Sequence, residues 1–221
     1  MSAQVRIEPA TEATIRDFAN VMVEAFSTEG TNAYLFDFSK RSAWRARVRA
    51  ALVEARLFHE NRNHVLVAIE DEQVVGGAIL AVNRGRPVLK RAIQTLRWIV
   101  SGVPLITAVR WRRVPGVMKA VNLPRKPDRP YYTLAAVAVH PAQQGKGIGR
   151  LILDEIHRIC DEDLGCTGVY LYTADTKNRV MYERCGYRCV AERSSGTLTM
   201  HHMFRPHPAN EFTLGTDDPS I

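Results

Sequence analysis

A long apolar run that leads into a glycine-rich turn constrains the fold of this 221-residue chain more than any other feature. Residues 131–139 read YYTLAAVAV, and such a run predicts a strand that is buried on both faces. Residues 147–164 follow, with isoleucines at helical spacing along one side. The order strand, turn, helix therefore predicts an α/β domain whose sheet is covered by helices.

The turn itself predicts an anion-binding site. Gly145, Gly147 and Gly149 lack side chains at positions where backbone N–H groups can converge on an anion. The helix that follows adds the positive end of its dipole. Lys146 and Arg150 supply full positive charges beside the glycines. Together these residues indicate a site for a pyrophosphate.

Two common nucleotide-binding patterns do not fit this turn. A dinucleotide-binding loop needs G-x-G-x-x-G, and the sixth position counted from Gly145 is Arg150. A Walker A loop needs Ser or Thr after its Gly-Lys pair, whereas Lys146 is followed by Gly147. Taken alone, the turn also fits a glycine-rich connection that binds no ligand.

A second motif downstream narrows the choice. Residues 144–149 read QGKGIG, and this Q-x-x-G-x-G pattern after a buried strand resembles motif A of the GNAT (Gcn5-related) acetyltransferase family. Residues 178–187 read NRVMYERCGY and resemble that family's N-x-x-x-Y-E-x-x-G-F element, one helix and one strand later. Residues 134–141, LAAVAVHP, together with the second motif, are most similar to the group that contains puromycin N-acetyltransferase.

The resemblance implies a fold and a domain arrangement. We expect a mixed α/β (α+β) GNAT fold, in which a mostly antiparallel central sheet with a splayed central strand pair is flanked by helices. We expect the GNAT domain to cover residues 1–206, with a basic helical insertion at 84–130 near the acceptor site. Residues 207–221 are expected to form a C-terminal tail.

The other apolar patterns agree with this order of elements. Gly76 and Gly77 lie inside one expected strand, where they allow a bulge or a close approach of backbone. The expected strands are 5–7, 64–69, 74–82, 168–173, 187–192 and 197–204. One helix is expected to begin after Thr11 as its N-cap. The other expected helices are 42–59, 88–100, about 105–113, 147–164 and 177–185.

The resemblance also implies acetyl-CoA as the donor substrate and no metal. Main-chain groups of the motif A strand would pair with the pantetheine arm, and the turn would hold the pyrophosphate. Tyr182 would protonate the departing CoA thiolate, since a phenol with a reference pKa near ~10 can donate at neutral pH. The structural alternative for Tyr182 is a core tyrosine. Asn178, which the family uses to hold the cofactor, has an ordinary first-turn asparagine as its alternative. The expected cofactor-binding residues are Val137, Ala138, Val139, Gln144, Gly145, Lys146, Gly147, Ile148, Gly149, Arg150 and Asn178.

The resemblance does not fix a general base. Many GNAT proteins carry a carboxylate on the motif A strand, but the Leu-Ala-Ala stretch of this strand offers none. Glu24, Glu29 and Asp37 lie where the family's first helices border the acceptor site, and His201 and His202 lie on the last strand pair. A water relay or an amine that arrives neutral are the alternatives.

The net charge of +7 comes from one segment. Residues 84–129 contain twelve Lys or Arg and one acid, Asp128, and are therefore net +11. The resembled group places variable helices here, so we expect Trp98, Trp111 and the apolar face of 88–100 to line the acceptor pocket. An anionic surface such as a membrane is the alternative partner. Nucleic acid is not expected, because no aromatic–basic strand pattern accompanies the charge.

Three functions fit these features. The first is transfer of acetyl to a primary amine of a small molecule, and in this reaction the amine attacks the thioester directly. The others are a protein lysine or N-terminal acetyltransferase and a non-catalytic acyl-CoA-binding sensor. We expect a cytoplasmic monomer or homodimer with reduced cysteines, because no signal or spanning run is visible and the four cysteines match no common zinc spacing. Cys185 replaces the family's leucine and would either pack or lie near the CoA sulfur.

Overall fold

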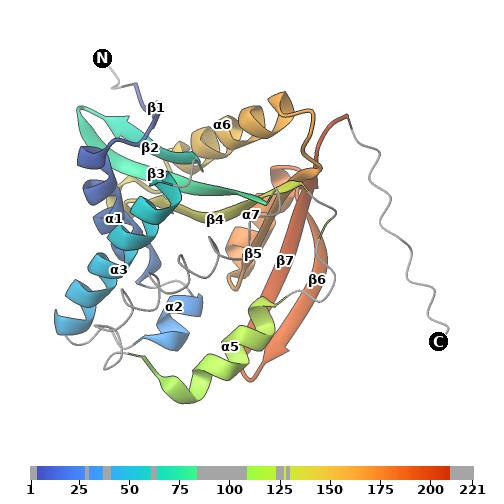
Figure 1. Cartoon of the computed structure of the whole chain (residues 1–221). Coiled ribbons are helices and arrows are strands. Elements are labelled where there is room, and N and C mark those ends of the chain that lie inside the picture. The colour runs from blue at the N-terminus through green and yellow to red at the C-terminus, as the bar shows by residue number, and fades with distance from the viewer. Residues whose placement is uncertain are drawn as a thin grey trace.

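A computed structural model of the chain describes residues 4–27, 30–36, 41–60, 64–83, 109–122, 127 and 130–209. Seven strands form one sheet in the order β1-β2-β3-β4-β5-β7-β6 (Figure 1). Within the described residues β4–β5 is the parallel pair, and all other neighbours are antiparallel. This is the mostly antiparallel α/β sheet that the sequence predicts. The strands are β1 (Arg6–Pro9), β2 (His64–Glu70), β3 (Gln73–Asn83), β4 (Tyr131–Val139), β5 (Gly168–Thr173), β6 (Arg188–Ser195) and β7 (Leu198–Pro206).

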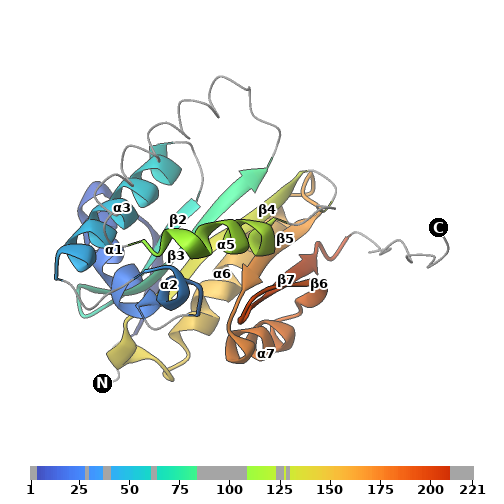
Figure 2. The same cartoon turned by 90° about the horizontal axis from the view of Figure 1, so that it is seen from below.

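The helices cover both faces of this sheet. They are α1 (Glu12–Phe26), α2 (Gly30–Leu35), α3 (Arg41–Glu60), α5 (Val114–Val121), α6 (Ile148–Glu162) and α7 (Thr176–Arg184), with short 3₁₀ turns η2 (Trp111–Arg113) and η3 (Pro141–Gln143). Helices α1 and α3 pack on β2 to β4, and α5 packs on β6 and β7 on the same side (Figure 2). Helices α6 and α7 cover the opposite face. None of the described helices is long and apolar enough to cross a bilayer.

Two glycines of β3 explain how α1 packs so closely. A Cβ at Gly77 would lie 2.7 Å from the ring of Phe18 and 2.4 Å from the carbonyl oxygen of Leu66. A Cβ at Gly76 would lie 2.9 Å from the carbonyl oxygen of Ala138 on β4. Side chains at these positions would separate α1 from the sheet or β3 from β4. The close approach that the sequence predicts for this pair is therefore confirmed.

A bulge in β4 changes the direction of its side chains. The register pairs Leu80 with Leu134 and Ile79 with Ala136, which leaves Ala135 as the extra, exposed residue. Leu134 therefore packs toward α6, whereas Ala136, two positions later, packs toward α1. Val137 consequently faces α6 again. A bulge of this kind bends a strand and redirects the residues that follow.

The segment before β4 differs from its prediction. A helix was expected at about 105–113, but Val109 forms an isolated bridge with Phe36 and the described helix is α5. Pro115, which reads as a helix breaker, occupies the first turn of α5, where its missing N–H costs nothing. Residues 88–100, the other expected helix of this segment, lie outside the described residues.

The end of the chain stays folded slightly beyond β7. His207 is buried, its N–H donates to the carbonyl of Thr167, and its Nε2 lies 3.2 Å from the carbonyl oxygen of Asp161. Residues 210–221, most of the expected tail, lie outside the described residues.

Candidate active site

Strands β4 and β5 separate in the middle of the sheet. Their register joins Tyr132 to Val169 and Thr133 to Tyr170, after which β4 continues to Val139 beside β3. Alternate N–H and C=O groups of a strand point to either side. The far half of β4 can therefore present main-chain groups to an extended ligand that lies between the two strands. Val137, Ala138 and Val139 all belong to this half.

The glycine-rich turn closes the end of that opening. Gly147 is the N-cap of α6 with a φ of 83°, and Gly145 has a φ of 81°. Only glycine adopts these angles without strain. Among the described residues, a Cβ at either position would meet no atom within 4 Å. The glycines are thus needed for backbone direction, and they precede the first N–H groups of α6, which a helix N-terminus offers to an anion.

The polar side chains of the turn are held in place by neighbours. Gln144 Nε2 donates to the carbonyl of Val139 at 3.1 Å, and Lys146 Nζ contacts the side-chain oxygen of Gln143. Arg150 Nε donates to Asp154 at 2.8 Å, one helical turn further along α6. The guanidinium therefore extends along the outer surface of the helix.

Cys185 lies beside the same turn. Its Sγ is 3.7 Å from Arg150 NH1, which links the end of α7 to the start of α6. Two roles were expected for this thiol, packing or a position near the CoA sulfur. Cys185 packs against the core cluster that includes Ile148 and Tyr182, and its relation to the CoA sulfur stays a prediction.

Helix α7 carries both residues of the second motif. Asp175 caps its N-terminus by accepting from the N–H of Lys177 at 2.7 Å. Asn178 and Tyr182 are four residues apart and so lie on one side of the helix. Tyr182 is 9% exposed and packs edge-on against Tyr187, with ring centroids 5.5 Å apart.

A half-buried hydrogen bond fixes Tyr187, the ring on which Tyr182 packs. The hydroxyl of Tyr187 and Nε2 of His157 on α6 lie 3.2 Å apart. Burial raises the pKa of Tyr187 well above its usual value, so this phenol stays protonated. Burial, assisted by the charge of Arg205, lowers the pKa of His157 to about 4, so the ring is neutral at pH 7. The pair joins Tyr187, just after α7, to α6 and adds no charge beside Tyr182.

The candidate bases are widely separated. Glu24 accepts from Nε2 of His140 at 2.9 Å, and Nδ1 of His140 accepts from the N–H of Ala142. This pair ties the end of α1 to the start of the turn, a connection that sequence spacing alone could not show. Glu29 and Asp37 lie outside the described residues.

The two histidines of β7 point to opposite faces. His202 is fully buried, donates from Nε2 to the carbonyl of Ala120 at 2.8 Å and accepts from Tyr170 at 2.6 Å. Burial lowers its pKa, and both ring nitrogens are engaged, so it links α5 to the sheet. His201 faces α7, where it contacts Glu192.

Segments far apart in sequence meet over the C-terminal end of β5. Arg113 donates to the carbonyl of Tyr34 at 2.9 Å and lies over its ring, which joins η2 to α2. A Cβ at Gly196, in the β6–β7 turn, would lie 3.4 Å from the Tyr34 hydroxyl. Ala174, just after β5, packs against this group. Trp111 is 56% exposed, and Trp98 lies outside the described residues.

A separate hollow of about 670 Å³ lies at the other end of α6. Its walls include Pro9, His64, Tyr132 and Asp163. These residues are not those of the turn or of α7, so the hollow is not part of the donor site.

Comparison with known proteins decides the family. The model of the acetyltransferase (GNAT) family matches residues 22–187. The chain belongs to the GNAT family. GNAT acetyltransferases use acetyl-CoA, so the predicted donor is confirmed. The family match does not distinguish the puromycin-like group, which stays a prediction. No curated protein sequence matches the chain significantly.

Solved structures agree with this GNAT fold. A protein described as histone acetyltransferase HPA2 and related acetyltransferase from Corynebacterium glutamicum is 23% identical, with a TM-score of 0.59 and coverage of 93% of this chain and 97% of that one. The PaiA N-acetyltransferase from Thermoplasma acidophilum in complex with coenzyme A is 13% identical, with a TM-score of 0.56 and coverage of 92% and 99%. A ribosomal-protein-alanine N-acetyltransferase from Brucella melitensis is 18% identical, with a TM-score of 0.55 and coverage of 91% and 99%. At these identities the likeness shows the fold alone.

Proposed function

We propose that this GNAT protein transfers the acetyl group of acetyl-CoA to a primary amine of a small molecule. The observation that carries the proposal is the separation of β4 from β5 beside the turn, with Tyr182 in the same hydrophobic cluster as Val137, Val139 and Ile148. Val137 to Val139 would pair with the pantetheine arm, and residues 144–150 would hold the pyrophosphate. Asn178, one turn before Tyr182, would hold the cofactor from α7.

The reaction needs no covalent enzyme intermediate. The amine nitrogen attacks the thioester carbonyl carbon, and a C–N bond forms as the carbonyl oxygen becomes an oxyanion. A backbone N–H of β4 would stabilise that oxyanion; loss of one such donor costs other enzymes about 3–4 kcal/mol. The C–S bond then breaks, and the CoA thiolate takes the phenolic proton of Tyr182. The amine releases its own proton to solvent or to a base, and Tyr182 takes up a proton from solvent to complete the turnover.

A contact between η2 and α2, on the proposed acceptor side, supports a small acceptor. The N–H of Arg110 donates to the carbonyl of Leu35, so η2 and α2 are joined by main-chain as well as side-chain bonds. We propose that residues 84–130 border the acceptor pocket, within a GNAT domain of residues 1–206. A protein acceptor would need an open groove along this side. The names of solved relatives include protein acetyltransferases, so a lysine or N-terminal amine is the alternative acceptor.

An amine panel tests the proposal. Small amines, polyamines, lysine peptides and free N-terminal peptides are each mixed with acetyl-CoA, and the free CoA thiol is measured. We expect turnover with members of the small-amine set. Turnover on peptides alone would establish the alternative acceptor, and acetyl-CoA binding without any turnover would establish a sensor.

Calorimetry with acetyl-CoA tests the donor half separately. Gly147→Ala strains a left-handed position, and we expect at least about tenfold weaker binding, since a left-handed non-glycine residue costs about 1–2 kcal/mol. Gly165→Ala is the matched control, because Gly165 is an exposed glycine at the other end of α6. Equal binding by both variants would show that the turn does not hold the donor.

A further inference from the structure

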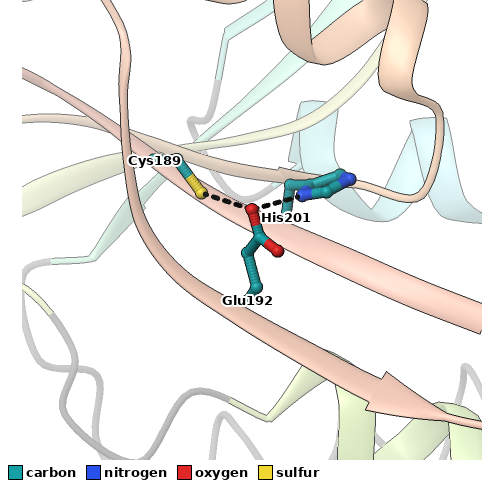
Figure 3. Close-up of side chains that lie close together, drawn as sticks. All are labelled: Cys189, Glu192 and His201. Atoms are coloured by element: carbon teal, nitrogen blue, oxygen red, sulfur yellow. Dashed lines mark hydrogen bonds and ion pairs between the residues drawn. The ribbon is translucent and has the colours of Figure 1, made fainter.

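Three different donor atoms meet on the α7 side of the β6–β7 hairpin. Cys189 and Glu192 lie on β6 and His201 lies opposite Glu192 on β7 (Figure 3). Glu192 Oε1 is 3.9 Å from the Cys189 sulfur and 3.3 Å from His201 Nδ1. All three donor atoms lie within 4.8 Å of one another.

A bulge brings the two β6 residues to the same face. Residues three apart in a regular strand point to opposite sides of the sheet. Here the register pairs Cys189 with Met203 and Ala191 with His202, so Val190 is the extra residue. Cys189 and Glu192 therefore both face α7, next to His201. The arrangement depends on this local backbone feature and so is built into the hairpin.

These donors suit zinc in type and spacing. Thiolate sulfur, imidazole nitrogen and carboxylate oxygen are the ligands that Zn²⁺ takes, at about 2.3 Å from sulfur and about 2.0–2.2 Å from nitrogen or oxygen. Tetrahedral angles with these lengths place neighbouring donor atoms about 3.4–3.6 Å apart. Two of the three observed separations, 3.3 and 3.9 Å, are close to this range, and the third, from the Cys189 sulfur to His201 Nδ1, is within 4.8 Å and would shorten on zinc binding. A fourth position would be left for water.

A guanidinium stands where the cation would be. Arg179 NH1 contacts Glu192 Oε1 and lies 3.4 Å from His201 Nδ1. Its Nε also donates to Glu183 at 2.9 Å, one turn further along α7. The side chain can leave Glu192 and still keep the Glu183 ion pair. The cluster thus already binds a cationic group, and a metal ion can take the place of that guanidinium.

We propose that Cys189, Glu192 and His201 bind one Zn²⁺ ion, which displaces the Arg179 guanidinium. The Cys189 thiol releases its proton as the zinc–sulfur bond forms, the neutral imidazole supplies Nδ1, and the carboxylate remains charged. This site is independent of the proposed acetyl transfer, because none of its three ligands belongs to the turn, to β4 or to the Asn178–Tyr182 side of α7.

Cobalt titration of the full chain tests the site. The reduced, chelator-treated protein is titrated with Co²⁺, and we expect one equivalent to give a thiolate-to-cobalt absorption band with visible bands of a tetrahedral site. Added Zn²⁺ should abolish both. Absence of the thiolate band in the wild-type protein would overturn the proposal.

Three variants test the sulfur ligand and the displacement of Arg179. Cys189→Ser should remove the thiolate band and weaken zinc at least about tenfold. Cys185→Ser, a second half-buried cysteine outside the cluster, should leave the band unchanged. Arg179→Gln should tighten zinc about tenfold, since it removes the competing cation. Weaker zinc binding by Arg179→Gln would overturn the displacement. A band that survives Cys189→Ser would belong to the buried Cys160–Cys166 pair, whose sulfurs are 3.1 Å apart, and would also overturn the proposal.

Discussion

The donor side and the acceptor side of the proposed active site are made in different ways. The donor side consists of β4, the turn at 144–149 and α7, which follow one another within about a quarter of the chain. Its proposed contacts are mostly main-chain groups. The acceptor side joins α2, α5 and the β6–β7 turn, which are far apart in sequence and held largely by side chains such as Arg113, which lies over the Tyr34 ring, and His202.

This difference explains how such a fold can keep one donor and change its acceptor. Main-chain binding depends on backbone shape, which many sequences can provide if a few glycines are kept. Side-chain contacts between remote segments change with every substitution. We therefore expect acceptor-side variants to change the KM for the amine and donor-side variants to change acetyl-CoA binding or kcat. The largest expected effect comes first.

Tyr182→Phe should have the largest effect. Loss of the phenolic proton donor should lower kcat about 10²-fold or more, with little change in the KM for acetyl-CoA. Steady-state release of CoA thiol at saturating donor measures both constants. Tyr187→Phe is the control, because it removes a neighbouring buried hydroxyl that bonds to His157. An unchanged kcat for Tyr182→Phe would remove this residue from the mechanism.

The free energy of unfolding should fall between pH 6.5 and about 4 because of His157. In the folded protein this ring stays neutral down to about pH 4, whereas an unfolded histidine takes up a proton near pH 6.5. The unfolded state thus binds more protons in this window, and stability falls as the pH falls. Allowing for partial exposure, we expect a loss of about 2 kcal/mol.

Chemical denaturation at several pH values measures this loss. His157→Gln keeps a polar partner for Tyr187 and should flatten the profile. The matched His59→Gln, at an exposed position, should leave the profile as it is. A profile that is equally steep in all three proteins would show that protonation of His157 does not cause the loss of stability.

His202→Phe should affect the acceptor side alone. The change keeps an aromatic ring but leaves the carbonyl of Ala120 without its donor and the Tyr170 hydroxyl without its acceptor, each at a cost of about 1–3 kcal/mol. We expect α5 to pack less firmly and the KM for the amine to rise about tenfold, with the KM for acetyl-CoA unchanged. Met118→Ala on the exposed side of α5 is the control. An equal rise in both KM values would contradict the separation of the two sides.

Gly149→Ala should have the smallest effects. It should raise the stability of the protein and weaken its binding of acetyl-CoA. A Cβ here would make an ordinary contact, 3.8 Å from Val139 Cγ2, within the first turn of α6. Alanine favours a helix over glycine, so the ligand-free protein should gain about 0.5–1 kcal/mol. The added methyl group should weaken acetyl-CoA binding severalfold. Thermal unfolding and calorimetry would show the two changes, and a gain in stability without weaker binding would exclude Gly149 from the donor site.

Local patterns predicted the elements of the proposed donor side. The apolar run became β4, the three glycines became the turn and the beginning of α6, and the N-x-x-x-Y spacing became one side of α7, because each depends on residues close in sequence. Helix α5 was missed because Pro115 and Gly116 read as breakers, although proline is well suited to a first helical turn.

The features that sequence could not show depend on tertiary geometry. The Glu24–His140 pair joins positions more than a hundred residues apart. The bulges at Ala135 and Val190 cannot be read from alternation, yet they decide which side chains share a face. The cluster of Cys189, Glu192 and His201 is a direct result, since a regular strand would have separated its first two members.

The parting of β4 and β5 would hold spent CoA nearly as well as fresh acetyl-CoA. Both carry the same pyrophosphate and pantetheine, and on the proposed mechanism these groups make most of the contacts. Product would therefore compete with donor for the same edge of β4, and turnover would follow the ratio of acetyl-CoA to CoA in the surrounding pool. An enzyme built in this way would run fast when acetyl groups are plentiful and would slow itself as they are used up.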